Sequence, residues 1–284
     1  MTLRSITRQV RTQATSDGAG VRLERSIGTA ALDHVDPFLL FDEFRSESGA
    51  DYVAGFPDHP HRGFETVTYM LAGHMHHRDH TGAEGHLGPG SVQWMTAGRG
   101  IVHSEMPEQE EGLLWGFQLW VNLPARAKMT EPRYQDIPAD AVPLVERDGL
   151  RVKVLAGEYG GARGPVDGVP TDPVYLDVEL DEGAVFEAPI SSERNALLYP
   201  IEGGPLLVPT DGDDAKSLAR GSLAVLGDGE GLRVHAEHRA RFLVIAGRPI
   251  GEPIARHGPF VMNTHEEIVQ AVHDFQSGRF LHEA

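Results

Sequence analysis

Two short sequence pairs carry residue types that can bind a metal ion. His59 and His61 are separated by one residue, as are His103 and Glu105, and eight of the 15 histidines lie between His59 and His103. Because successive side chains of a β-strand alternate between its faces, each pair would point to one side of its strand. Two such pairs on neighbouring strands would present three imidazole nitrogens and one carboxylate. This donor set suits Fe(II), Mn(II), Ni(II), Cu(II) or Zn(II) better than an all-oxygen calcium site, and it leaves positions for exchangeable ligands.

Two questions remain open from the spacing alone. Glu65 shares the parity of His59 and His61, so a regular strand would present it on the same face, and parity does not choose between Glu65 and Glu105. The other histidines of the segment lie in a glycine-rich connection, which predicts a solvated hairpin loop outside any buried site. They are His74, His76, His77, His80 and His86.

The composition restricts the chemistry further. The 284 residues include no cysteine, which excludes disulfides, thiolate nucleophiles, iron–sulfur clusters and Cys-type zinc sites. With 25 Lys and Arg against 42 Asp and Glu, the net charge of −17 opposes binding to phosphate backbones and anionic membranes. No apolar run approaches the ~18 residues of a membrane span, and the N-terminal residues lack the apolar core of a signal peptide. We therefore expect a cytoplasmic protein that contacts neither nucleic acid nor membrane directly.

Short apolar or alternating runs, separated by turn residues, must position the candidate ligands. Such spacing, together with 33 glycines and 19 prolines, is typical of an all-β sandwich or barrel. The end of the chain differs, because Thr264 and Glu267 form a capping box before an apolar helical pattern that Gly278 ends. The predicted strands cover residues 66–71, 91–95, 113–121, 150–155, 174–180, 197–201, 222–226 and 241–245.

An internal repeat indicates two related barrels in tandem. The sequences GSV and GRGIVHSE, which begin at Gly90 and Gly98, are echoed by GSL and GEGLRVHAE, which begin at Gly221 and Gly229. Composition shifts in the proline-rich, charged stretch 124–143, where we place the boundary. This predicts an N-terminal barrel over residues 1–135 and a C-terminal barrel over residues 144–284 that ends in the helix.

The second copy of the repeat keeps few candidate ligands. At the offset of 130 residues that relates the earlier parts of the two copies, the positions of the first histidine pair and its glutamate are Pro189, Ser191 and Asn195. Only His235 and Glu237 remain, and an ordinary polar pair on a strand explains them. We therefore expect one metal per chain, in the N-terminal barrel.

Two long motifs closely resemble the pirin family of the cupin superfamily. They are HPHRGFETVTYML at residues 59–71 and QWMTAGRGIVHSE at residues 93–105, with DPFLLFD upstream at residues 36–42. The similarity continues through residues 116–124 and 258–264 and covers nearly the whole chain. It implies a bicupin of two β-sandwich barrels, with a mononuclear metal, usually iron, in the N-terminal barrel.

The resemblance also implies roles for individual residues. By motif matching, His59, His61, His103 and Glu105 are the ligands of one divalent metal, and Glu105 is also a candidate base. The broader cupin pattern would use Glu65 to complete the metal shell, but pirins use the later glutamate, which leaves Glu65 behind the ligands. Three residues that flank the ligands in sequence are candidates to line the substrate pocket, namely Phe56, Trp94 and Met106.

Two functions follow from the resemblance. Some pirins resemble quercetin 2,3-dioxygenases, which add O2 to a flavonol bound at the metal, open its ring and release carbon monoxide. This predicts an oxidoreductase that acts on a small aromatic substrate and O2. The alternative is a non-enzymatic, iron-binding regulatory protein or redox switch that acts through a protein partner, such as a transcription factor or a metabolic enzyme. Bound iron with turnover of quercetin would favour the first function, and bound iron without turnover the second.

Overall fold

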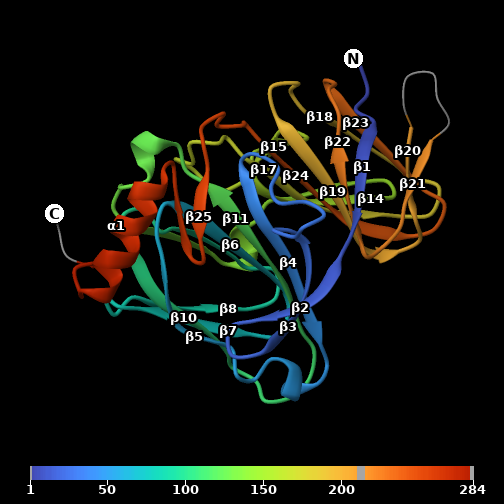
Figure 1. Cartoon of the computed structure of the whole chain (residues 1–284). Helices are drawn as coiled ribbons and strands as arrows, with labels where there is room; N and C mark the ends of the chain where they lie inside the picture. The colour runs from blue at the N-terminus through green and yellow to red at the C-terminus, as the bar shows by residue number, and fades with distance from the viewer. Residues whose placement is uncertain (1, 210–214, 282–284) are drawn as a thin grey trace. The chain divides into compact units, whose positions relative to one another are not determined.

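The computed structural model in Figure 1 describes residues 2–209 and 215–281. These residues form mostly β-strands and one α-helix, which confirms the predicted all-β class with a C-terminal helix. They divide into two compact units. We call the unit of residues 14–28, 38–139 and 250–284 the N-terminal barrel, and that of residues 1–13, 29–37 and 140–249 the C-terminal barrel.

The N-terminal barrel is built from a seven-stranded and a four-stranded antiparallel sheet. The seven-stranded sheet has the order β12(Arg133–Ile137), β9(Val92–Thr96), β6(Phe64–Ala72), β11(Leu114–Asn122), β4(Phe38–Ser46), β3(Val21–Ile27) and β2(Gln13–Asp17). The four-stranded sheet has the order β5(Phe56–His61), β10(Ile101–Pro107), β7(Met75–Asp79) and β8(Glu84–Leu87). Three short 3-10 helices lie in connections, at Gly49–Asp51, Ala125–Ala127 and Ala139–Ala141.

The C-terminal barrel repeats this architecture. Its seven-stranded sheet has the order β1(Ile6–Arg11), β22(Ser222–Leu226), β19(Asn195–Gly203), β24(Ala240–Gly247), β17(Val174–Leu180), β14(Leu150–Ala156) and β13(Leu144–Arg147). Its four-stranded sheet has the order β18(Val185–Pro189), β23(Gly231–Ala236), β20(Leu206–Val208) and β21(Lys216–Leu218). A small hairpin, β15(Glu158–Tyr159) and β16(Ala162–Arg163), precedes β17.

The two barrels are not divided by a single boundary at residues 135–144, because a segment from each end of the chain belongs to the other barrel. In the N-terminal barrel the edge strand β12 follows β11 along the chain, but the corresponding edge of the C-terminal barrel is β1, which pairs with β22 (Figure 1). The first strand of the sequence therefore completes the second barrel. The last 35 residues, from Ile250 to the C-terminus, belong to the N-terminal barrel instead.

The C-terminal segment is fastened next to the first histidine pair. It contains the hairpin β25(Ala255–His257) and β26(Phe260–Met262) and the helix α1(His265–Gln276), which has the predicted capping box. Arg62 pairs with Asp274, with 2.8 Å between Nη1 and Oδ2, and its guanidinium lies 4.4 Å from the centre of the Phe280 ring. Because Arg62 directly follows His61, the segment holds the end of β5 in place.

Candidate metal centre

Three histidines converge from two neighbouring strands. His59 and His61 lie on β5 and His103 lies on β10, where it pairs directly with His59. The Nε2 atom of His59 is 2.9 Å from Nε2 of His61 and 3.1 Å from Nε2 of His103. Among the described residues, these three form the one group of three or more His, Asp or Glu whose ligand atoms all lie within 4.8 Å of one another. We call this group the histidine triad.

The protonation of the histidine triad suits a metal ion. Nδ1 of His59 lies 2.9 Å from the carbonyl oxygen of Pro57, which only accepts, so Nδ1 is the donor and Nε2 is the nitrogen that faces the other two rings. Burial, and then the neighbouring His59, hold the pKa of His61 well below its usual value. Burial and the other two histidines do the same for the pKa of His103. Neutral imidazoles that direct nitrogens at one another are the donors that a borderline divalent metal accepts.

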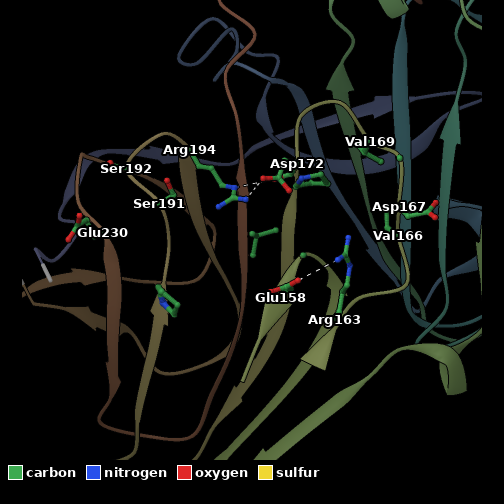
Figure 2. Close-up of a pocket in the computed structure, with 15 residues that line it drawn as sticks. Glu158, Arg163, Val166, Asp167, Val169, Asp172, Ser191, Ser192, Arg194 and Glu230 are labelled. Atoms are coloured by element: carbon green, nitrogen blue, oxygen red, sulfur yellow. Dashed lines mark hydrogen bonds and ion pairs between the residues drawn. The ribbon is translucent and has the colours of Figure 1, made fainter. Parts of the chain in front are cut away.

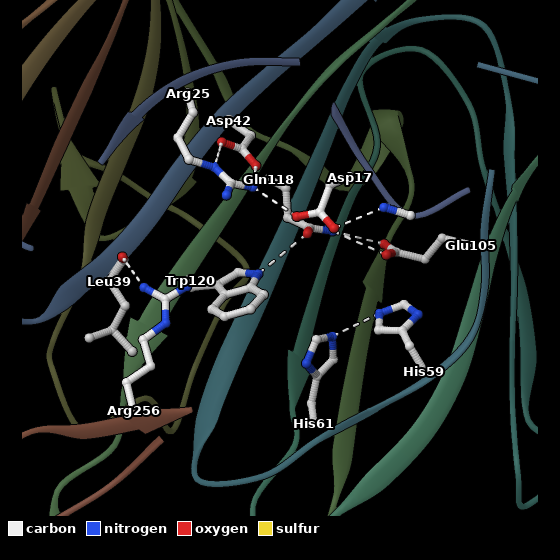
Figure 3. A network of polar contacts seen from close by, with 11 residues as sticks. Asp17, Arg25, Leu39, Asp42, His59, His61, Glu105, Gln118, Trp120 and Arg256 are labelled. Atoms are coloured by element: carbon white, nitrogen blue, oxygen red, sulfur yellow. Dashed lines mark hydrogen bonds and ion pairs between the residues drawn. The ribbon is translucent and has the colours of Figure 1, made fainter. Parts of the chain in front are cut away.

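Glu105 lies beside the histidine triad but is held by other side chains. It is on β10, past an irregularity in the pairing with β5, and its carboxylate is buried. Oε1 accepts a hydrogen bond of 3.1 Å from Thr68 Oγ1. Gln118 Nε2 donates to both Oε1 and Oε2 at 3.1 Å (Figure 3). Glu105 is not a member of the 4.8 Å group, although it lines the same cavity as His59 and His61.

Glu65 occupies a different place. It lies on β6, opposite Thr96 of β9, and its Oε1 accepts a hydrogen bond of 2.7 Å from Thr96 Oγ1. Burial raises the pKa of Glu65 to about 7. Glu65 is buried and is not among the residues that line the cavity.

The prediction of a solvated loop is wrong for His77. This residue is on β7, where it pairs with Glu105, and only 1% of it is exposed. Its ring stacks on Tyr134 with 4.7 Å between ring centres, and Gln93 contacts its Nδ1. Burial lowers the pKa of His77, although the neighbouring Asp136 opposes this shift. The loop was predicted from the glycine content, which hid the alternation of β7: inward-facing His77 follows outward-facing His76.

A cavity of about 570 Å³ opens onto the histidine triad. Its walls are apolar on several sides and charged at the rim; they include Leu23, Leu40, Phe44, Phe56, Met75 and Trp120, with Arg25, Asp42 and Arg256. Of the three predicted pocket residues, Phe56 lines the cavity. Trp94 is fully buried on β9, and Met106 packs against Gly55, so neither is among the described lining residues.

Sequence reasoning missed the side chains that complete the cavity. The Trp120 ring centre lies 5.3 Å from that of His61, and the Arg256 guanidinium lies 4.9 Å from the Trp120 ring on the opposite side from the histidines (Figure 3). Arg25 binds Asp42 through two hydrogen bonds of 2.8 and 2.7 Å. Arg256 comes from the exchanged C-terminal segment, so no local motif could have placed it here. The alternation of β11, which presents Gln118 and Trp120 on one face, was the signal available.

The C-terminal barrel has a different interior. The inward-facing side chains of β18 and β23 are apolar and buried, and they are Phe186, Ala188, Leu232, Val234 and Ala236. Pro189 is exposed at the end of β18 and Ser191 lies beyond it, so the offset of 130 residues does not lead to inward positions. His235 pairs with Val185 on the outward face.

The C-terminal barrel also carries a cavity, but with different chemistry. Its volume is about 720 Å³, and it opens between the connection 157–173 and the loop after β18 (Figure 2). Arg194 pairs with Asp172, and Arg163 lies 3.6 Å from Glu158. Ion pairs therefore line this cavity, and the described residues that line it include no histidine. Separately, no helix in the described part of the chain is long and apolar enough to cross a membrane.

Comparisons with known proteins agree with this architecture. The Pirin family model matches residues 20–121, and the model of the Pirin C-terminal cupin domain matches residues 175–281. A pirin-like protein of Caulobacter vibrioides is 54% identical, over 99% of this chain and 100% of its own length. Human pirin is 44% identical, over 97% of this chain and 93% of its own length.

A solved structure extends the comparison to an enzyme. The crystal structure of quercetin 2,3-dioxygenase from Acinetobacter baumannii is similar with a TM-score of 0.88 and 33% sequence identity. The match covers 98% of this chain and 99% of that one. Both barrels and the exchanged ends are therefore within the compared region.

Proposed function

This chain belongs to the pirin family, and from that premise we propose that it is a metal-dependent dioxygenase that opens the ring of a flavonol such as quercetin and releases carbon monoxide. The observation that carries the proposal is the convergence of three imidazoles, with Nε2 of His61 and Nε2 of His103 at 2.9 and 3.1 Å from Nε2 of His59, beside a cavity of about 570 Å³. The similar quercetin 2,3-dioxygenase from Acinetobacter baumannii supports it.

In this proposal His59, His61, His103 and Glu105 hold one divalent metal per chain, which is Fe(II), with Mn, Ni, Cu or Zn as substitutes. The donor set of three imidazoles and one carboxylate fits such an ion, and Nε2 of His59 already faces the other two rings. When bound, the metal would acidify a hydroxyl of the substrate and allow electrons to pass between substrate and O2. The cysteine-free sequence offers no thiolate that would favour a softer site.

The chain itself would bind and orient the substrate. Phe56 and Trp120 offer flat apolar surfaces against which an aromatic ring can lie. Glu105 lines the same cavity, and its Oε2 is the atom that would accept the proton of the substrate hydroxyl. Arg25 and Asp42, which also line the cavity, form an ion pair of 2.7 Å.

One experiment tests the proposal directly. Freshly purified protein is analysed for metal, and the loss of quercetin absorbance and the release of carbon monoxide are followed in air and under nitrogen. We expect about one metal per chain and turnover only in air, with both lost in His61→Ala. Substrate loss that persists under nitrogen, or equal rates in His61→Ala, would eliminate the dioxygenase. Bound iron without any turnover in air would favour a regulatory protein that acts through a protein partner. The cytoplasmic location stays a prediction.

A further inference from the structure

A polar chain joins the cavity wall to the carboxylate of Glu105. The indole Nε1 of Trp120 donates to Oε1 of Gln118 at 3.3 Å, and Nε2 of Gln118 donates to both oxygens of Glu105 at 3.1 Å (Figure 3). Thr68 donates a third hydrogen bond to the same carboxylate. All of these groups lie in the N-terminal barrel, on β6, β10 and β11.

The two partners of Gln118 allow only one orientation of its amide. An indole N–H only donates, so it must face the amide oxygen, and an ionised carboxylate only accepts, so it must face the amide NH2 group. Trp120 is itself fixed, because its ring packs 4.4 Å from the Phe64 ring, 5.3 Å from the His61 ring and 4.9 Å from the Arg256 guanidinium. A rigid aromatic side chain therefore sets the direction in which Gln118 presents its donors.

We propose that Gln118 is a positioning residue for Glu105, and that Trp120 fixes the Gln118 amide in the orientation that holds the carboxylate beside the histidine triad. The inference rests on the proposed metal site and deepens it. Glu105 lies outside the 4.8 Å group of histidine nitrogens, so it depends on other side chains for its place. Groups that hydrogen-bond a metal ligand orient it, and their removal commonly lowers metal affinity about 10–100-fold.

The test uses Co(II), whose visible absorption reports its ligands, on the full-length protein freed of metal. In Gln118→Leu we expect the Kd for Co(II) to rise about 10–100-fold and the visible spectrum of the bound ion to change. Gln93→Leu is the matched control, because Gln93 is a buried glutamine of the same seven-stranded sheet but contacts His77 and Asp136. An unchanged Kd and spectrum in Gln118→Leu, or an equal loss in Gln93→Leu, would overturn the proposal.

A second matched pair removes single hydroxyl groups. Thr68→Val deletes a donor to Glu105, whereas Thr96→Val deletes a donor to the buried Glu65. One hydrogen bond corresponds to about 2–10-fold in affinity, and we expect that loss only in Thr68→Val. Equal Co(II) affinities in the two variants would contradict the role assigned to the hydrogen bonds that hold the Glu105 carboxylate.

Trp120→Phe keeps an aromatic ring but removes the indole N–H together with the five-membered ring that carries it, and it serves as the second test if Gln118→Leu fails to fold. We expect about a 2–10-fold weaker Kd for Co(II) and an altered spectrum, because the amide can then turn its oxygen toward Glu105. Wild-type affinity and spectrum in this variant would overturn the role of Trp120. If instead the wild-type protein binds no Co(II), or His61→Ala binds it equally well, the proposed metal site fails rather than this inference.

Discussion

The two barrels have matching sheets apart from the exchanged edge strand, yet among the described residues a group of converging histidines lies in the N-terminal barrel alone. At the inner face of β5 and β10 the N-terminal barrel has His59, His61 and His103. At the inner face of β18 and β23 the C-terminal barrel has Phe186, Ala188 and Val234 among its buried residues. In both barrels, strand alternation directs every second side chain inward. The types of a few inward residues then determine whether the interior can bind a metal or only forms an apolar core.

The largest expected effect separates the two interiors by metal content. His103→Ala and His61→Ala should each lose most of the bound metal and the turnover that depends on it, because two imidazoles and one carboxylate make a much weaker site. His235→Ala, on the outward face of the C-terminal barrel, should keep about one metal per chain. Elemental analysis of dialysed protein measures this. Two tightly held metals in the wild type, with one lost in His235→Ala, would break the comparison.

The choice of carboxylate is tested in the same way. Glu105→Ala should lower metal content and turnover, because Glu105 faces the cavity that contains His59 and His61. Glu65→Ala should retain the metal, since its carboxyl bonds Thr96 away from the described cavity walls. Retention in Glu105→Ala with loss in Glu65→Ala would show that the wrong glutamate was assigned.

The apolar interior of the C-terminal barrel should contribute to the free energy of unfolding. Phe186 is fully buried in the core of the C-terminal barrel, where its ring contacts the rings of Tyr159 and Phe242. Phe186→Ala should lower the free energy of unfolding by about 3–5 kcal/mol, since it removes a large buried ring and leaves a cavity. Urea denaturation measures the loss. Val185→Ala, an exposed neighbour, is the control and should change little.

The buried Glu65 gives the N-terminal barrel a pH dependence. Its pKa is about 7 in the folded protein and about 4.5 in the unfolded chain, so the folded state binds more protons between these values. Stability should therefore fall as pH rises from about 4.5 to 7, by at most about 3 kcal/mol. Glu65→Gln should flatten this part of the curve of unfolding free energy against pH. An unchanged slope would mean that Glu65 does not carry the effect.

The smallest predicted effect lies at the start of α1. Thr264 Oγ1 accepts a hydrogen bond from the backbone N–H of Glu267 at 3.2 Å, and the Glu267 carboxylate accepts one from the backbone N–H of Thr264 at 3.0 Å. Thr264→Ala should cost about 1 kcal/mol of stability, and Thr264→Ser should restore most of it. Thermal unfolding of the two variants measures the difference. A Thr264→Ala protein as stable as the wild type would show that the Thr264 cap does not stabilise the helix.

Local patterns predicted much of this molecule from its sequence, and long-range contacts set the rest. The histidine pairs, the C-terminal helix and its capping box depend on neighbouring residues, so alternation and capping rules could find them. Arg256 reaches the cavity from an element far away in the sequence, and the contact of Gln118 with Glu105 depends on how β11 and β10 face each other. His77 was misjudged because glycines on either side of a short strand resemble a loop.

The exchange of the chain ends has a consequence for how the protein is made. The N-terminal barrel needs Arg256, Asp274 and Phe280 for its cavity and for the anchor at Arg62, and these residues follow the strands of the C-terminal barrel along the chain. The C-terminal barrel needs β1, which is synthesised long before its partner β22. Neither barrel is encoded by one continuous stretch, so a gene fragment cut at residues 135–144 would yield two incomplete halves. The walls of the candidate metal site are therefore complete only after the strands of the C-terminal barrel have been synthesised.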